Sequence, residues 1–74
     1  MAIFIFPYNP VVYSAEPKKD NVLEIQFKKP GNKLQTRRYE NVEPRIIYQL
    51  VNSQQPLTFF TQNIKNKYNV TVKS

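Results

Sequence analysis

The clearest pattern in the chain is an alternation of apolar and polar residues over positions 22–28. Leu23, Ile25 and Phe27 are the apolar members, and charged or amide side chains stand between them. A period of two is typical of a β-strand that buries one face. The segment 29–32, Lys-Pro-Gly-Asn, has the composition of a tight turn. The sequence therefore predicts a β-hairpin whose second strand covers residues 34–39.

The register of this hairpin follows from where its turn is centred. A turn centred on positions 30–31 places Phe27 opposite Leu34. It also places Glu24 opposite Arg37, which is a favourable cross-strand pair. A shift by one residue would place apolar and polar side chains of the hairpin on the same side, so the pattern supports this register. One side then carries Leu23, Ile25, Phe27, Leu34 and Thr36, and the other carries Glu24, Gln26, Lys28, Lys33, Gln35, Arg37 and Tyr39.

The rest of the chain predicts further strands and two helices. Residues 3–6 and 11–13 are rich in β-forming side chains. Apolar residues recur at helical spacing over 42–51, where Asn41 is a candidate cap and Pro44 falls in the first turn. A second helical stripe begins near Pro56, and residues 70–72 either form a short strand or stay irregular. We expect one small α+β domain spanning residues 1–74, in which an antiparallel sheet of three or four strands is followed by two helices packed on one face.

Three stretches of the chain are similar to one known family. They are the strand residues Leu23-Glu24-Ile25-Gln26-Phe27, the segment Tyr39-x-Asn41-Val42 with Pro44, and the pattern Phe59-Phe60-x-x-Asn63-Ile64-x-x-x-Tyr68. In this order they resemble the KTSC domain, a short domain found alone and fused to lysyl-tRNA synthetases, over about residues 11–68. The sequence departs from the family at the inserted Glu43 and in the missing cysteine of the C-terminal motif. The resemblance implies the same fold and, through the synthetase fusion, a link to RNA, and it brings no catalytic residues.

The composition excludes most catalytic chemistry. The chain has neither His nor Cys, so a serine would lack its usual base, and only oxygen ligands remain for a metal. Glu40 and Glu43 could form a carboxylate pair, but acidic side chains at the start of a helix are favoured on electrostatic grounds alone. A histidine-free ribonuclease that uses Arg, Lys and Tyr is the one enzymatic alternative. We therefore expect a protein without enzymatic activity, metal or cofactor.

The first residues predict neither export nor membrane insertion. The apolar run over residues 2–6 is shorter than the core of a signal peptide and is followed by Pro7. The absence of Cys is compatible with a reducing compartment. We expect a cytoplasmic protein that does not enter a membrane.

The predicted polar side of the hairpin is the candidate binding surface. Eleven Lys and Arg residues against five Asp and Glu residues give a net charge of +6. Such a surface can bind a polyanion by neutralising phosphates, and a tyrosine on it can stack on an unpaired base. The alternative is that the lysines only keep an exposed strand soluble. The sequence predicts binding of RNA or single-stranded DNA, with phosphates on Lys28, Lys29, Lys33 and Arg37 and a base on Tyr39.

The N-terminal segment predicts a protein interface. Ile3, Phe4, Ile5 and Phe6 are apolar on both faces of the predicted strand, and one small sheet cannot hide both. We expect a homodimer through this strand, or its addition to the edge of another protein's sheet. The second possibility describes an inhibitor or assembly protein encoded by a phage or plasmid. The alternative is that the segment packs against the chain's own helices.

Overall fold

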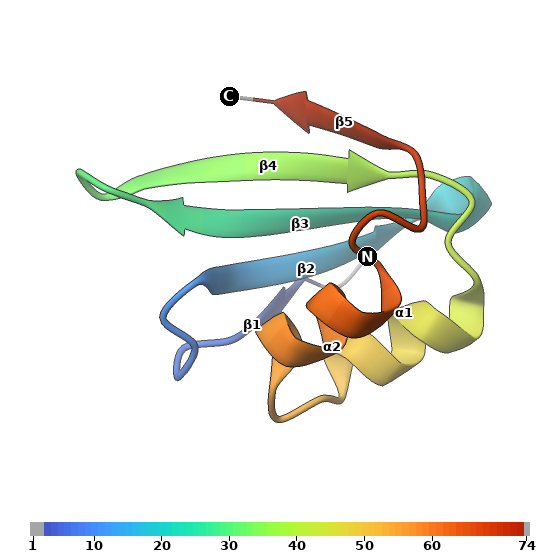
Figure 1. Cartoon of the computed structure of the whole chain (residues 1–74), viewed down its shortest axis with the longest axis horizontal. Helices are drawn as coiled ribbons and strands as arrows, with labels where there is room; N and C mark the ends of the chain where they lie inside the picture. The colour runs from blue at the N-terminus through green and yellow to red at the C-terminus, as the bar shows by residue number, and fades with distance from the viewer. Residues whose placement is uncertain (1–2, 74) are drawn as a thin grey trace.

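The computed structural model describes residues 3–73 and shows a five-stranded antiparallel sheet with two helices (Figure 1). Each strand pairs with its neighbours in chain order, so the sheet is a meander. The α+β class is confirmed, but the sheet has more strands than the three or four we predicted, because residues 70–73 return beside the hairpin. The strands are β1 (Phe4–Ile5), β2 (Val12–Lys18), β3 (Val22–Lys29), β4 (Lys33–Tyr39) and β5 (Val70–Lys73).

The two helices lie between β4 and β5 in the chain and cover one face of the sheet (Figure 1). Both α1 (Pro44–Val51) and α2 (Pro56–Asn63) begin at a proline, whose missing N–H is not needed in the first turn. Asn41 does not cap α1, because it has a left-handed φ of 58° and the cap position is occupied by Glu43. Among the described residues, no helix is long and apolar enough to cross a membrane.

The β3–β4 hairpin has a register that differs from our prediction by one residue. Lys29 pairs with Lys33, so the loop contains three residues rather than two. Gly31 and Asn32 both adopt left-handed conformations, with φ values of 78° and 59°, and Gly and Asn tolerate this region best. Asn32 therefore lies within the loop, and Lys33 rather than Asn32 stands opposite Lys29. The shift moves every side chain of β4 to the opposite face of the sheet. Lys33, Gln35, Arg37 and Tyr39 now face the side of the helices. Leu34, Thr36 and Arg38 face the open side.

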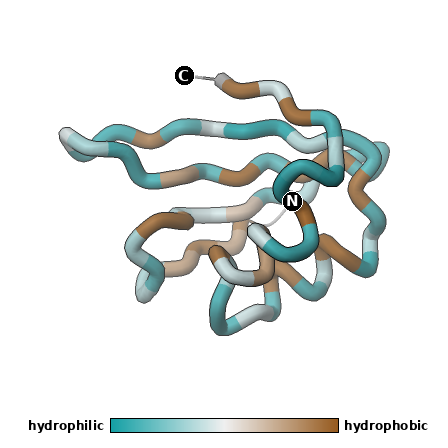
Figure 2. Tube along the Cα trace, viewed as in Figure 1, coloured by the Kyte–Doolittle hydropathy of each residue, from teal (hydrophilic) through white to brown (hydrophobic). Residues whose placement is uncertain are grey.

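The core lies between the sheet and the helices. Leu23 and Ile25 of β3 are fully buried, as the alternation predicts, and Figure 2 shows that alternation along the strand. The ring of Phe60 from α2 packs edge-on against Phe27 and Tyr39, with centroids 5.2 and 5.6 Å apart. Such edge-to-face contacts stabilise aromatic clusters beyond their buried area. This cluster joins α2 to the two central strands.

The open face of the sheet is polar. A hydrogen-bonded row crosses β2, β3 and β4, in which the Ser14 hydroxyl donates to Oε1 of Gln26 at 3.1 Å. Nε2 of Gln26 donates in turn to Oγ1 of Thr36 at 3.4 Å. Beside this row, Arg38 faces Glu24 across the strands, with Nη1 and Oε2 4.0 Å apart. The predicted partner of Glu24 was Arg37, which the observed register places on the other face.

Candidate nucleic-acid interface

Three of the predicted contact residues meet at the end of the β3–β4 hairpin, which projects beyond the helices (Figure 1). Lys28, Lys29 and Lys33 are exposed and line a hollow of about 440 Å³, which we call the hairpin hollow. Nζ of Lys28 donates to the carbonyl oxygen of Asn9 at 2.9 Å, so this ammonium group is held beside the β1–β2 loop. The remaining lining residues are Tyr13, Asn32 and Leu34.

Tyr13 brings an aromatic ring to the hairpin hollow, although we did not predict it as a site residue. Its placement depends on an irregularity in β2, where the pairing with β3 shifts between Val12 and Ser14. Both neighbours are buried, whereas Tyr13 is half-buried. An irregularity of this kind re-aims a side chain without leaving a signature in the apolar–polar pattern. The chain therefore offered no signal that would place Tyr13 beside the lysines.

Arg37 and Tyr39 do not join the three lysines. Tyr39 is only 3% exposed and packs against Phe60, so its predicted role of stacking on a base does not fit the structure. Burial raises the pKa of Tyr39 above its ordinary value of 10.0, and a hydrogen bond donated by Arg37 and the positive charge of Arg37 oppose this shift. The predicted basic face is not formed either, because Lys28 lies on the open side while Lys29, Lys33 and Arg37 face the other side.

A second hollow, of about 180 Å³, lies between β4, β5 and the segment that follows α2. We call it the Arg37 hollow. Arg37 and Lys65 line it together with two tyrosines, and valines 70 and 72 of β5 complete its apolar part. The guanidinium carbon of Arg37 lies 4.6 Å from the centre of the Phe27 ring, and its Nε donates to Oε1 of Gln35 at 3.0 Å. The full lining is Arg37, Tyr39, Lys65, Asn66, Tyr68, Val70 and Val72.

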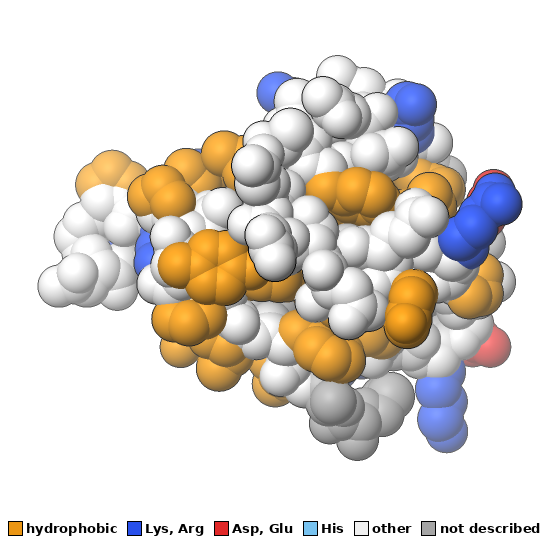
Figure 3. All heavy atoms as spheres, turned by 90° about the horizontal axis from the view of Figure 1, so that it is seen from below, with side chains coloured by type: hydrophobic (Ala, Val, Ile, Leu, Met, Phe, Trp, Pro, Cys, Tyr) orange, Lys and Arg blue, Asp and Glu red, His pale blue; other side chains and the backbone are white. Residues whose placement is uncertain are grey.

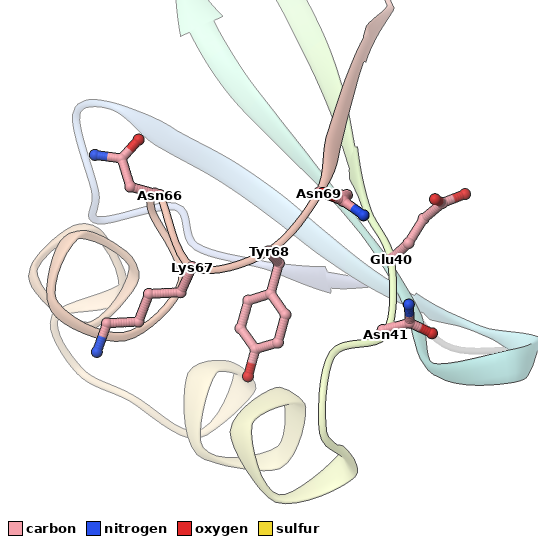
Figure 4. A pocket seen from close by; sticks show the side chains of 6 residues that line it. All are labelled: Glu40, Asn41, Asn66, Lys67, Tyr68 and Asn69. Atoms are coloured by element: carbon pink, nitrogen blue, oxygen red, sulfur yellow. The ribbon is translucent and has the colours of Figure 1, made fainter.

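A polar hollow of about 330 Å³ adjoins the Arg37 hollow and shares Asn66 and Tyr68 with it. Figure 4 shows it between the β4–α1 connection and the α2–β5 loop, with the side chains of Glu40 and Asn41 on one side and Lys67 pointing away on the other. The backbone N–H of Glu40 donates to the carbonyl oxygen of Asn69 at 3.1 Å, which ties the two segments together. No group of three or more metal-binding side chains occurs among the residues described.

The carboxylates gather at the end of the sheet away from the hairpin tip. The backbone N–H of Val42 donates to the carbonyl oxygen of Asn21 at 2.9 Å, so the β2–β3 turn lies beside the β4–α1 connection. All five acidic residues are found in or next to these two segments: Glu16, Asp20, Glu24, Glu40 and Glu43. In the described part of the chain, the ion pairs within 4.0 Å join Lys18 to Glu16, Arg38 to Glu24 and Glu40, and Arg45 to Glu43. None of them involves the three hairpin lysines.

The four residues of the predicted interface segment differ in their exposure. Ile3, Phe4 and Ile5 are 57%, 37% and 54% exposed, whereas Phe6 is 3% exposed and belongs to the core. Phe6 is therefore not an interface residue of the single chain, because it packs against the chain's own core. Phe4 also lines an apolar groove of about 340 Å³ against α1, together with Tyr48. Figure 3 shows hydrophobic side chains spread over this side of the molecule, with Lys and Arg at its border.

Comparison with known proteins agrees with these features of the fold. The sequence profile of the KTSC domain matches residues 16–68. A crystal structure of a KTSC domain protein from Yersinia pestis superposes with a TM-score of 0.72, at 26% sequence identity over 86% of each chain. The search of curated proteins found no significant match. The family match covers well over half of the chain, which confirms the resemblance noted in the sequence: this chain belongs to the KTSC domain family.

Proposed function

We propose that this protein binds RNA or single-stranded DNA at the end of the β3–β4 hairpin and acts by binding rather than by catalysis. The observation that carries this proposal is the hairpin hollow, which three exposed lysines line without a carboxylate. Lys29 and Lys33 stand directly opposite each other, an arrangement that destabilises a hairpin on its own. A phosphate between like charges removes this repulsion and releases counterions.

The lining of the hairpin hollow favours a single strand over a duplex. Tyr13 and Leu34 place an aromatic ring and an apolar side chain among the lysines. Unpaired bases can stack on such groups, whereas the bases of a duplex are already stacked on each other. The fusion of KTSC domains to lysyl-tRNA synthetases supports RNA as the ligand. We propose that the protein acts in the cytoplasm, where RNA is present.

Fluorescence anisotropy with labelled single strands of about ten nucleotides, a length within the usual site sizes, tests the proposal. Three phosphate contacts predict that log K falls against log salt with a slope of about −2 for a single strand. The double variant Lys28→Ala/Lys33→Ala should weaken binding and reduce the slope to about −0.7. The matched control Lys19→Ala/Arg45→Ala removes the same charge from exposed side chains outside the hairpin.

Two results would contradict the proposal. One is the absence of binding at about 50 mM salt, where such contacts are strong. The other is an equal loss of affinity in the two double variants, because the effect would then come from net charge and not from the hairpin.

A second candidate function, protein interaction through β1, is favoured by the exposed apolar side chains of Ile3, Phe4 and Ile5 at the edge of the sheet. Residues 3–15 contain no charge, so no charged side chain there opposes pairing with another strand. We propose a homodimer through this edge. Light scattering should show that Phe4→Asp dissociates it and that Val72→Asp, at the opposite edge, does not. A monomer in the unmodified protein would exclude the dimer, and partners captured after nuclease treatment would point to another protein instead.

A further inference from the structure

Arg37 carries a positive charge that forms no ion pair within 4.0 Å among the described residues. Its side chain is half-buried, and its neighbours are the Phe27 ring and the neutral groups of Gln35 and Tyr39. The next residue, Arg38, lies instead within 4.0 Å of two carboxylates. A charge partly withdrawn from water gains free energy when an opposite charge approaches it. Because Arg37 is already stacked and hydrogen-bonded, little side-chain freedom remains to be lost when an anion binds.

The Arg37 hollow has the size and lining for one flat ring. An engineered cavity of about 150 Å³ holds benzene, and this hollow measures about 180 Å³. Tyr68 and Val72 give it aromatic and aliphatic walls, and Asn66 supplies amide donors and an acceptor at its rim. Lys65 is exposed and provides a second cation beside Arg37. A ring attached to a phosphate matches this combination of walls and charges.

The Arg37 hollow also lies on the course of a strand bound at the hairpin. Lys33 and Arg37 project from the same face of β4, four residues and therefore about 13 Å apart. Gln35 lies between them on that face and offers a further polar contact. A nucleic acid bound at Lys33 that continues along this face reaches the Arg37 hollow.

We propose that the Arg37 hollow holds one unpaired base of the bound strand, with preference for the single ring of a pyrimidine, while Arg37 and Lys65 contact its phosphate. This inference rests on the proposed nucleic-acid binding and adds a base preference to it. The hairpin lysines contribute affinity for any sequence, and the Arg37 hollow contributes discrimination.

The test compares oligo-U and oligo-A of the same length in the anisotropy assay. The unmodified protein should bind oligo-U at least about fivefold more tightly, the lower end of what stacking of one base contributes. Val72→Trp, which fills the hollow, should abolish this ratio, and Lys65→Ala, which removes a phosphate contact made only when a base occupies the hollow, should reduce it. Lys28→Ala/Lys33→Ala should lower both affinities and keep the ratio. Lys65→Ala decides the outcome if circular dichroism shows that Val72→Trp is unfolded.

A separate measurement uses uridine monophosphate alone, followed through the amide NMR signals of Asn66 and Val72. Shifts at these residues support the Arg37 hollow without relying on the hairpin. If oligonucleotides bind in a salt-dependent way but oligo-U and oligo-A bind equally, the inference is wrong and the proposed function stands. If no oligonucleotide binds but the monophosphate shifts these signals, the proposed function fails and the hollow is supported as a nucleotide site. If neither ligand binds, both proposals are overturned.

Discussion

Arg37 lies over the ring of Phe27, with its guanidinium carbon 4.6 Å from the ring centre, so that a cation covers the rim of the hydrophobic core. The two residues belong to neighbouring strands and project from the same face of the sheet. The ring face attracts the positive charge, and the planar guanidinium group packs flat against it. This contact explains how β4 can present an arginine to the side of the helices. The same register leaves Leu34 43% exposed on the other side.

Arg37→Lys should therefore destabilise the protein although it keeps the charge. The ammonium group cannot reproduce the planar contact with Phe27, and we expect the free energy of unfolding to fall by about 0.5–1 kcal/mol. Urea denaturation measures this change. Arg38→Lys is the control, because Arg38 pairs with carboxylates at 4.0 Å and covers no ring. Equal stability of the two variants would show that the contact contributes nothing.

The hairpin loop depends on the left-handed conformation of Asn32, which has a φ of 59°. Asn32→Val should lower the free energy of unfolding by about 1–2 kcal/mol, because a β-branched residue is strained in this region. Asn32→Gly should preserve stability. Lys33→Val places the same side chain at the next, exposed strand position, where little loss is expected. An equal loss in both valine variants would show that backbone strain at Asn32 is not the cause.

The raised pKa of Tyr39 predicts a loss of stability at alkaline pH. Below about pH 10 the phenol is protonated in both the folded and the unfolded chain. As the pH rises above this value, the unfolded chain releases the proton first, so the free energy of unfolding decreases. Denaturation from about pH 9 to about pH 11 should show a steeper decrease for the unmodified protein than for Tyr39→Phe. Tyr48→Phe, at a side chain 68% exposed, should follow the unmodified protein, and identical slopes for all three would contradict the assignment.

The last two apolar residues of the N-terminal segment, Ile5 and Phe6, should respond differently to truncation. Phe6→Ala should lower the free energy of unfolding by about 3–5 kcal/mol, because Phe6 is buried in the core. Ile5→Ala should change it by no more than about 0.5 kcal/mol at low protein concentration, because Ile5 is 54% exposed. Thermal unfolding of dilute protein measures both. A large loss for Ile5→Ala would mean that this side chain is covered in solution.

The sequence predicted the elements of the fold better than their alignment. The inward direction of Leu23, Ile25 and Phe27 follows from a period of two and is confirmed. The register depended on whether Lys29 pairs with Asn32 or with Lys33, and the composition of the turn segment allows both. The burial of Phe6 could not be separated from the exposure of Ile5, because their segment is apolar at every position and has no period.

The candidate site was predicted only in part, because the positions of its more distant residues depend on the strand register. The side chains of Lys28, Lys29 and Lys33 lie next to the turn, so they meet in either register. Tyr39 lies six or more residues from them along the chain, and a shift by one position moved it from the solvent to the core. Tyr13 comes from a different hairpin, and only the irregularity in β2 brings it close.

The separation of carboxylates and hairpin lysines along the strands makes the molecule an electric dipole. The strands run along its longest dimension of 32 Å, so a distant polyanion exerts a torque on it and turns the hairpin forward before any contact forms (Figure 1). At about 0.1 M salt the screening length is about 10 Å, much shorter than the molecule, and this pre-orientation is lost. Rates of encounter with a polyanion should therefore fall with salt more steeply than the number of contacted phosphates alone predicts.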